Sequence, residues 1–246
     1  MPRFFLDIHT PAAYPCPARI TGADAAHIAK ALRMRAGETL TLCDGRGTDY
    51  ACEIAGFDNG DVLLSILSAA PSRTEPSLYV TLYQGYPKGD KLEWIIQKAV
   101  ELGAAEIVPV VTARSVARPE ENPAKAGRKQ ERWQKIATEA AGQCGRGVLP
   151  AVSAPLAFRE LLIQLEGEPA VVFYEGGGES LSALVTPGCS RLSVIIGPEG
   201  GFAPEEIDAL REAGARVATL GPRILRCETA PLAALSILMH LTGNME

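Results

Sequence analysis

The chain has 246 residues, with 24 Lys and Arg against 29 Asp and Glu, so its formal net charge at pH 7 is -5. A protein that coats nucleic acid indiscriminately has a uniformly basic surface, so this balance excludes that class and leaves room only for a local basic face. Hydrophobic residues make up 47% of the chain and charged residues 22%, which excludes a disordered or collagen-like protein. A chain of this length forms one large domain or two smaller ones.

Strand signals dominate the first 72 residues. Four segments rich in β-branched and aromatic residues are expected to be strands, and turn-rich pieces such as DGRG and DNG separate them. A helix from about residue 24 to residue 34 interrupts them, with Asp24 as its candidate N-cap. Short strands with tight turns predict a small β-barrel. The expected strands are residues 4–8, 38–43, 49–55 and 61–67.

A change of pattern follows residues 69–77, AAPSRTEPS, whose two prolines among small and polar residues are typical of a linker. We therefore predict two domains, residues 1–72 and residues 73–246. In the second, strands alternate with helices, which predicts an α/β fold with a largely parallel sheet covered on both faces. The expected strands are residues 78–83, 107–111, 170–174, 192–196 and 217–220. The expected helices are residues 92–102, 125–142, 156–165, 204–213 and 229–241.

The charges are unevenly distributed between these regions. Residues 73–150 carry 12 basic and 9 acidic residues, whereas residues 151–246 carry 6 basic and 12 acidic residues. On an ideal helix Arg128, Arg132 and Lys135 share one face, while Trp133 and several alanines occupy another. A solvated helix face is one interpretation. Convergence of this face with other basic residues on the phosphates of a nucleic acid is the other.

Several common sites are excluded. The six cysteines form no C-x-x-C pair and the three histidines are scattered, so we expect reduced thiols and no metal. The start MPRFFLDIHT lacks the pattern of a secretory signal, and no segment approaches the roughly 18 apolar residues of a membrane span, so we expect a cytoplasmic protein. The chain contains no P-loop motif and no G-x-S-x-G. The sequence EGGG at residues 175–178 follows a strand, but a flexible turn is its simplest interpretation.

Two loops are more informative. GPEGGF at residues 197–202 and LGPRILRCETA at residues 220–230 each join a predicted strand to a predicted helix. Glycines let main-chain N–H and C=O groups approach a flat or charged ligand, and both loops follow carboxyl ends of strands, where open α/β sheets bind ligands. A simple tight turn between strand and helix would explain either loop alone, but it explains the presence of both loops poorly. The apolar residues of the second loop favour an adenine-bearing cofactor over a triphosphate.

These paired loops resemble the signature of the RsmE family, the 16S ribosomal RNA uridine-N3 methyltransferases. Shorter matches extend over almost the whole chain and include RFF at residues 3–5, LRMR at 32–35, KGDK at 88–91 and QKAVELG at 97–103. One departure is Cys227, where the family more usually has Thr or Val. Because Arg226 and Glu228 are in place, we expect only a local change in packing there.

The resemblance implies a PUA-like β-barrel over residues 1–72 that binds RNA, followed by a SPOUT methyltransferase domain over residues 73–246. It also implies S-adenosylmethionine bound in a deep trefoil knot, a homodimer, and 16S ribosomal RNA or the small ribosomal subunit as partner. The expected activity is methylation of N3 of a specific uridine. Methylation at another RNA position, such as a ribose 2′-oxygen, and a non-catalytic RNA-binding assembly factor are the alternatives.

The expected site residues fall into three groups. The proton of N3 must be removed, so Glu228 or Glu199 is the candidate acceptor, while Arg226 or Arg223 stabilises charge on uracil or grips phosphate. The expected cofactor-binding residues are Gly197, Pro198, Glu199, Gly200, Gly201, Leu220, Gly221, Ile224, Leu225, Arg226, Thr229 and Ala230. The expected RNA-binding residues are Arg3, Arg33, Arg35, Lys88, Lys91, Arg114, Arg132 and Arg146.

Overall fold

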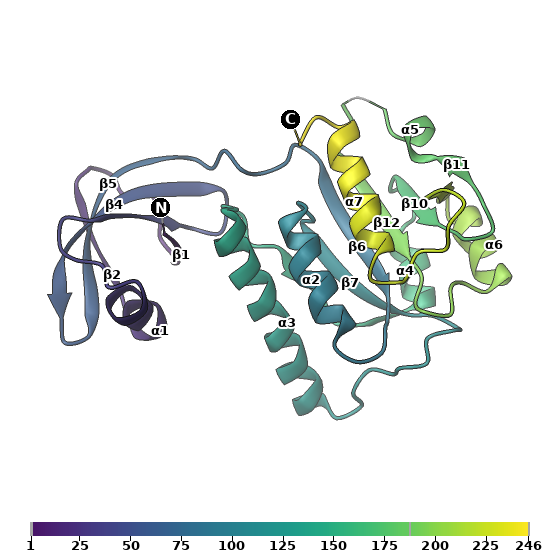
Figure 1. The fold of residues 1–246 in the computed structure, drawn as a ribbon, viewed down its shortest axis with the longest axis horizontal. Helices are drawn as coiled ribbons and strands as arrows, with labels where there is room; N and C mark the ends of the chain where they lie inside the picture. The colour runs from purple at the N-terminus through teal and green to yellow at the C-terminus, as the bar shows by residue number, and fades with distance from the viewer. Residues whose placement is uncertain (1, 187, 246) are drawn as a thin grey trace. The chain divides into compact units, whose positions relative to one another are not determined.

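The computed structural model describes residues 2–186 and 188–245, which form two compact units (Figure 1). The first unit contains the chain up to Glu75 together with Ala141–Leu149. The second contains Pro76–Ala140 and the chain from Pro150 onward. In the described ranges, no helix is long and apolar enough to cross a membrane.

The first unit is built on a five-stranded sheet with the order β1-β3-β4-β5-β2, in which β1 and β3 are parallel and the other neighbours antiparallel. The strand β2 was not predicted, because Pro17 within it is unfavourable in a strand and is tolerated only because β2 lies at the edge. Closure of the sheet into a barrel stays a prediction. The strands are β1 (Arg3–Phe5), β2 (Cys16–Ile20), β3 (Thr39–Cys43), β4 (Thr48–Asp58) and β5 (Asp61–Pro71).

The residues in the turns stabilise the hairpins of this sheet. Between β4 and β5, Asn59 and Gly60 have φ angles of 49° and 91°, the left-handed pair that a tight hairpin requires. Between β3 and β4, the Asp44 carboxylate accepts hydrogen bonds from the backbone N–H groups of Arg46 and Thr48. The predicted helix over residues 24–34 is shorter and irregular, since α1 (Gly22–Ala26) continues into the π-helical turn η1 (His27–Ala31).

A returning segment, Ala141–Leu149, completes the first unit. The N–H of Gly47 donates to the carbonyl of Gly147 at 3.1 Å, and the N–H of Leu149 donates to the carbonyl of Gly45 at 3.0 Å. The turn between β3 and β4 is thus paired with chain that lies about one hundred residues later in the sequence. No periodicity in the sequence predicts this pairing.

The second unit is built on a parallel sheet with the order β11-β13-β10-β12-β6-β7-β8, and β9 pairs with β7 beside β8. The predicted α/β fold with a parallel sheet is therefore confirmed. The central strands are almost entirely apolar, as strands covered on both faces require. The strands are β6 (Tyr79–Gly85), β7 (Glu106–Val111), β8 (Ala151–Val152), β9 (Leu156–Ala157), β10 (Ala170–Phe173), β11 (Glu179–Ser180), β12 (Arg191–Ile196) and β13 (Arg216–Thr219).

Helices cover both faces of this sheet (Figure 1). On one face, Leu161 of α4 and Ile207 of α6 pack on Val172 and Ile195 of the sheet. On the other, α2 and α7 pack against each other. In α3 the two predicted faces are confirmed, because Arg128, Arg132 and Lys135 are exposed and Trp133 is buried. The helices are α2 (Lys91–Glu101), α3 (Pro123–Cys144), α4 (Phe158–Gln164), α5 (Leu181–Leu184), α6 (Pro204–Glu212) and α7 (Ala230–Leu241).

Candidate functional site

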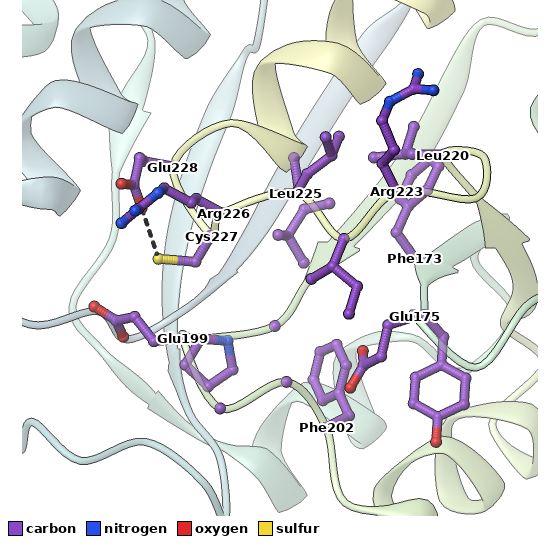
Figure 2. A pocket seen from close by; sticks show the side chains of 18 of the residues that line it. Phe173, Glu175, Glu199, Phe202, Leu220, Arg223, Leu225, Arg226, Cys227 and Glu228 are labelled. Atoms are coloured by element: carbon purple, nitrogen blue, oxygen red, sulfur yellow. Dashed lines mark hydrogen bonds between the residues drawn. The ribbon is translucent and has the colours of Figure 1, made fainter.

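A cavity of about 480 Å³ lies at the carboxyl ends of β10, β12 and β13 in the second unit (Figure 2). Its size falls within the range of small-molecule sites. Phe173, Ile196 and Phe202 give it apolar walls, and the two glycine-containing loops enclose the rest. The lining residues are Lys91, Phe173–Glu175, Ile196–Phe202, Thr219–Gly221, Arg223–Glu228 and Ala230.

The first loop is held at both of its ends. The buried Glu206 of α6 accepts the N–H of Ala203 through Oε2 at 2.9 Å and the N–H of Ala113 through Oε1 at 2.8 Å. At the other end, the amide nitrogen of Gln84 donates to the carbonyl of Gly197 at 3.3 Å. Because these side chains and backbone groups are buried or partly buried, they keep the loop backbone in one position before any ligand arrives.

The second loop begins with a backbone turn. Gly221 has a φ of 92°, and its N–H donates to Thr219 Oγ1 at 3.2 Å. The carbonyl of Arg226 then accepts the N–H groups of Thr229 at 2.8 Å and Ala230 at 2.9 Å, which starts α7. Between these two turns Ile224 is 86% exposed although it lines the cavity, so an apolar side chain faces the space that a ligand would fill.

One end of the cavity is charged. Lys91 Nζ lies 2.9 Å from Oε1 of Glu199 and 3.5 Å from Oε2 of Glu228, so a single ammonium group bridges the two glycine-containing loops. The backbone N–H of Lys88 also donates to Glu199 Oε1 at 3.1 Å, and the Cys227 thiol donates to Glu228 Oε2 at 3.2 Å. Figure 2 shows Glu199, Arg226, Cys227 and Glu228 gathered at this end, with Phe173 and Glu175 at the other.

The pKa values of this charged end favour ionised carboxylates. Burial raises the pKa of Glu199, but hydrogen bonds from Lys91 and from backbone N–H groups outweigh it and lower the pKa overall. Burial also raises the pKa of Glu228, and the Cys227 thiol, its own backbone N–H and Lys91 together reverse that effect. Burial, followed by the nearby carboxylates, raises the pKa of Cys227 to about 12, so this thiol stays protonated and acts as a donor.

Glu175 is a lining residue that the sequence interpretation missed. It opens the EGGG segment, which was interpreted as a flexible turn, and its carboxylate lies against Gly201 of the first loop. Within the described ranges, Glu175 forms no hydrogen bond or ion pair. Its place directly after β10, at the same sheet edge as the two glycine-containing loops, is the signal that would have found it.

The comparisons with known proteins agree with this architecture. Residues 74–239 match a family model described as an RNA methyltransferase domain, and residues 20–67 match one described as an RNA methyltransferase PUA domain. The ribosomal RNA small subunit methyltransferase E of Bacillus subtilis is 38% identical, over 98% of this chain and 97% of that protein. The chain belongs to the RsmE family.

Other RsmE-family proteins extend the likeness. The protein of the same name from a Synechocystis strain is 32% identical over 88% of this chain and 71% of its own length. The crystal structure of the RsmE protein from Neisseria gonorrhoeae bound to S-adenosyl methionine superposes with a TM-score of 0.87, at 30% identity and 98% coverage of both chains. The PUA match lies within the first unit, so that unit is PUA-like.

The structure brings most of the predicted RsmE-type site together. All of the predicted cofactor-binding residues except Thr229 line the one cavity, and so do the catalytic candidates Glu199, Arg226 and Glu228. Lys91, which was predicted to bind RNA, lies among the catalytic candidates instead of apart from them. Its partners are distant in sequence, so spacing alone does not reveal its position.

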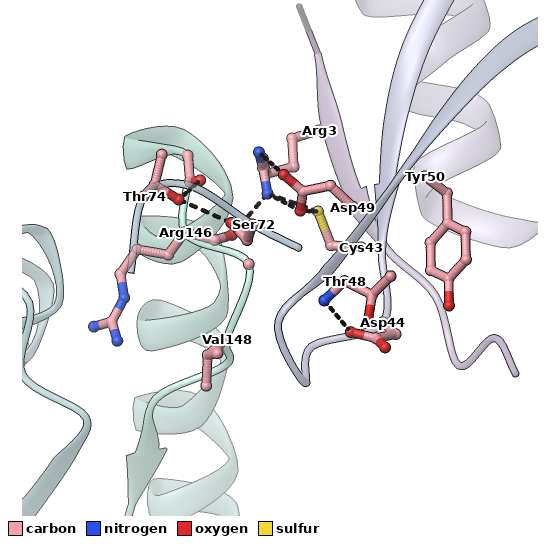
Figure 3. A network of polar contacts seen from close by, with 12 residues as sticks. Arg3, Cys43, Asp44, Thr48, Asp49, Tyr50, Ser72, Thr74, Arg146 and Val148 are labelled. Atoms are coloured by element: carbon pink, nitrogen blue, oxygen red, sulfur yellow. Dashed lines mark hydrogen bonds and ion pairs between the residues drawn. The ribbon is translucent and has the colours of Figure 1, made fainter. Parts of the chain in front are cut away.

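Two other predicted RNA-binding residues take part in a polar network inside the first unit (Figure 3). Arg3 donates to both oxygens of Asp49, at 2.7 and 2.8 Å, and its Nη1 also reaches the backbone carbonyl of Arg146 at 3.3 Å. Arg146 is only 4% exposed and pairs with Glu75 at 2.9 Å. In this arrangement the guanidinium of Arg146 is unavailable to a phosphate, so we leave it out of the surface proposed below.

The remaining predicted RNA-binding residues are exposed. Arg33 and Arg35 follow η1 in the PUA-like unit, and Arg33 has the unusual φ of 54°. Lys88 and Arg114 lie beside the cavity, since the backbone of Lys88 bonds Glu199 and Arg114 Nη1 donates to the carbonyl of Gly200 at 3.1 Å. Arg132 pairs with Glu93 at 2.6 Å. Among the described residues, no group of three or more His, Cys, Asp or Glu side chains could hold a metal ion.

Proposed function

We propose that this protein transfers a methyl group from S-adenosylmethionine to N3 of a specific uridine of 16S ribosomal RNA in the small ribosomal subunit. One observation carries the proposal. A single cavity combines apolar walls, close backbone approach and a charged end in which two carboxylates and Arg226 lie together. Small ribosomal subunits are cytoplasmic, and we place the activity there.

The cavity fits the cofactor by size and by chemistry. Phe173, Ile224 and Leu225 offer apolar surface to an adenine ring, and the glycines of the first loop expose backbone N–H and C=O groups to polar edges. Glu175 adds a carboxylate, without an ion pair among the described residues, that is suited to ribose hydroxyls or to positive charge. When bound, S-adenosylmethionine supplies a methyl group on a positively charged sulfur.

The chain's own residues must then orient uracil and manage its proton. A neutral imide nitrogen has no free lone pair for in-line attack, so N3 must lose its proton, and cationic groups must stabilise the charge that appears on the uracil oxygens. Arg226 and Glu228 both line the charged end of the cavity, so a stabilising cation and a proton acceptor are available to the same base (Figure 2). Alignment of the two reacting atoms supplies much of the remaining acceleration.

The RNA contacts are proposed on each unit separately. In the PUA-like unit the exposed Arg33 and Arg35 form one basic surface. In the second unit Lys88 and Arg114 flank the cavity, and Arg132 lies on the exposed face of α3. Binding through such phosphate contacts weakens as salt concentration rises.

The activity is tested with small ribosomal subunits that lack the modification and with labelled cofactor. We expect label on uridine N3, identified by mass analysis of the isolated nucleosides. Label on a ribose 2′-oxygen or on another base would replace the proposed target by another RNA position. RNA binding without any transfer of label would establish a non-catalytic RNA-binding protein instead.

We also propose that the second unit contains a deep trefoil knot. The family resemblance supports this proposal. An experimentally determined backbone trace checks it.

A homodimer is the proposed assembly, formed through the outer face of α7. This helix, APLAALSILMHL, is apolar on nearly every side, and Ile237 remains 41% exposed on it. Trp94, on the neighbouring α2, is 43% exposed. Exposed large side chains on two packed helices are typical of a surface that another subunit covers.

Replacing Ile237 with Asp should therefore weaken the dimer, because it places a charge in an apolar interface. We expect the dissociation constant to rise at least tenfold, which corresponds to about 1.4 kcal/mol. Sedimentation measures it as a shift toward monomer at a concentration where the wild type is dimeric. Ile163→Asp is the matched control, since Ile163 is 66% exposed on α4, on the opposite face of the sheet. Equal effects of the two substitutions would contradict the proposed interface.

A further inference from the structure

The bridge that Lys91 forms is the least expected feature of the site. Lys91 is the first residue of α2, and it contacts one carboxylate from each glycine-containing loop, Glu199 at 2.9 Å and Glu228 at 3.5 Å. The side chains of Lys91, Glu199 and Glu228 are 34%, 27% and 23% exposed, so solvent only partly screens their charges. The bridge links the two walls of the cavity at its charged end.

The two carboxylates are held very differently. Oε1 of Glu199 accepts both the shorter bond from Lys91 and the backbone N–H of Lys88 at 3.1 Å, so it fastens the chain before α2 to the first loop. This bonding fixes Glu199 to a backbone N–H as well as to Lys91, and because both bonds stabilise the charged form, Glu199 is the more firmly held of the two carboxylates.

Glu228 is freer to react. Its Oε2 accepts the Cys227 thiol at 3.2 Å and meets Lys91 only at 3.5 Å. Within the described part of the chain, no backbone N–H of another residue fastens this carboxylate as the N–H of Lys88 fastens Glu199. Arg226, on the same loop, lines the same charged end of the cavity (Figure 2). Glu228 therefore combines a less constrained carboxylate with a cation at the same end of the cavity, which is what removal of the uracil proton requires.

We propose that Glu228 accepts the N3 proton, and that Lys91 is a positioning residue which holds Glu228 in place through its bridge to Glu199. The assignment rests on the proposed function. The proton on N3 passes to Glu228 Oε1, and the lone pair left on N3 forms the new bond to the methyl carbon. The carbon–sulfur bond breaks with its electron pair left on sulfur, which becomes a neutral thioether. Glu228 then releases its proton to water.

A pH dependence follows from the charges that face Glu228. Lys91 from α2 and Cys227 from its own loop contact it directly, while Glu199 lies on the other side of Lys91 and Arg226 lines the same end of the cavity. Glu228 works only when ionised, so the rate falls as the pH falls through its pKa. Removal of the Lys91 charge raises that pKa, and the acid limb of the rate profile moves to higher pH.

The test compares single substitutions in the full-length protein, with unmodified small ribosomal subunits as substrate. We expect Glu228→Gln to lower kcat at least about a hundredfold, while cofactor still raises the melting temperature. Glu199→Gln should lose less than about tenfold, because the amide oxygen can still accept the N–H of Lys88. Lys91→Met should shift the acid limb of kcat to higher pH, and Lys91→Arg should restore it.

A second measurement follows the titration of Glu228 directly and does not depend on turnover. Carbon-13 NMR of the protein without cofactor or RNA should show the Glu228 carboxyl titrating at higher pH in Lys91→Met than in the wild type. Lys98→Met is the matched control, since Lys98 lies on the same helix and pairs with Glu101. It should leave both the rate profile and the carboxyl titration unchanged.

Three results would overturn the assignment: Glu228→Gln within about tenfold of wild type, Glu199→Gln as damaging as Glu228→Gln, or Lys91→Met raising only the KM for subunits. The last would make Lys91 a phosphate contact. A wild-type protein that leaves uridine N3 unmethylated would defeat the proposed function, and this assignment with it. If the wild type methylates N3 and Glu228→Gln is equally active, this assignment fails and the proposed function stands.

Discussion

Gly85→Ala is expected to abolish the stabilisation that S-adenosylmethionine gives to the protein. A Cβ atom at Gly85 would stand 2.6 Å from the carbonyl carbon of Gly197 and nearer still to the nitrogen of Pro198. Both are backbone atoms of the first glycine-containing loop, so no side chain can rotate away to relieve the clash. The loop must move, and the cavity wall moves with it.

The size of the effect follows from ligand linkage. Cofactor at about 100 times its dissociation constant stabilises a folded state that alone binds it by roughly 2.7 kcal/mol. We expect that gain to disappear in Gly85→Ala, and overpacking to cost the cofactor-free protein about 1–3 kcal/mol. Thermal unfolding with and without cofactor measures both quantities. A cofactor gain equal to that of the wild type would show that Gly85 does not set the position of the loop.

Gly127→Ala is the matched control for this substitution. Gly127 is exposed in α3, and a Cβ atom there meets nothing within 4 Å. Alanine in a helix is favoured over glycine by about 0.5–1 kcal/mol, so this variant should be slightly more stable than the wild type. Its response to cofactor should be that of the wild type.

Glu75→Ala should cause a large loss of stability in the first unit. Glu75 Oε2 accepts bonds from Arg146 at 3.2 and 2.9 Å, while Oε1 accepts the N–H groups of Gly147 at 2.8 Å and Val148 at 3.0 Å. Because Arg146 is only 4% exposed, removal of this carboxylate takes a charged partner from a buried guanidinium. Breaking such a pair from one side costs about 3–5 kcal/mol.

Hydrogen exchange resolves this loss by region. Peptides from β4 and from the returning segment should exchange faster in Glu75→Ala, whereas peptides from β12 should not change. Glu75→Gln should be intermediate, because its amide oxygen still accepts the two N–H groups. Asp208→Ala, which breaks the exposed pair with Arg211, should stay within about 0.5 kcal/mol of the wild type. A loss in Glu75→Ala as small as that of Asp208→Ala would contradict the role given to Glu75.

The parts of the fold that could be predicted were those encoded by local pattern. The apolar strand β12, followed by glycine, proline and an N-terminal helix signal, located both the strand and the loop after it. The second loop followed from the same pattern between β13 and α7. Such signals lie within a few residues of one another, so periodicity and turn chemistry suffice to find them.

The parts that could not be predicted depend on pairing over long distances. Arg3 contacts Asp49, and Lys91 contacts Glu199. The two members of each pair are far apart in the sequence, so local residue spacing does not predict these contacts. Arg3, Lys91 and Arg146 were therefore predicted to bind RNA. The strand β2 was missed for a different reason, because Pro17 argues against a strand and only the place of β2 at the sheet edge permits it.

The returning segment also sets an order for biosynthesis. The turn between β3 and β4 bonds the backbone of Gly147 and Leu149, and Glu75 finds a charged partner in Arg146. A nascent chain that ends before these residues leaves those groups to water, so the amino-terminal unit cannot complete its fold when its own strands emerge. Its completion waits until β6, α2, β7 and α3 have been synthesised. The usual rule that the first domain folds first thus applies here only to part of that domain.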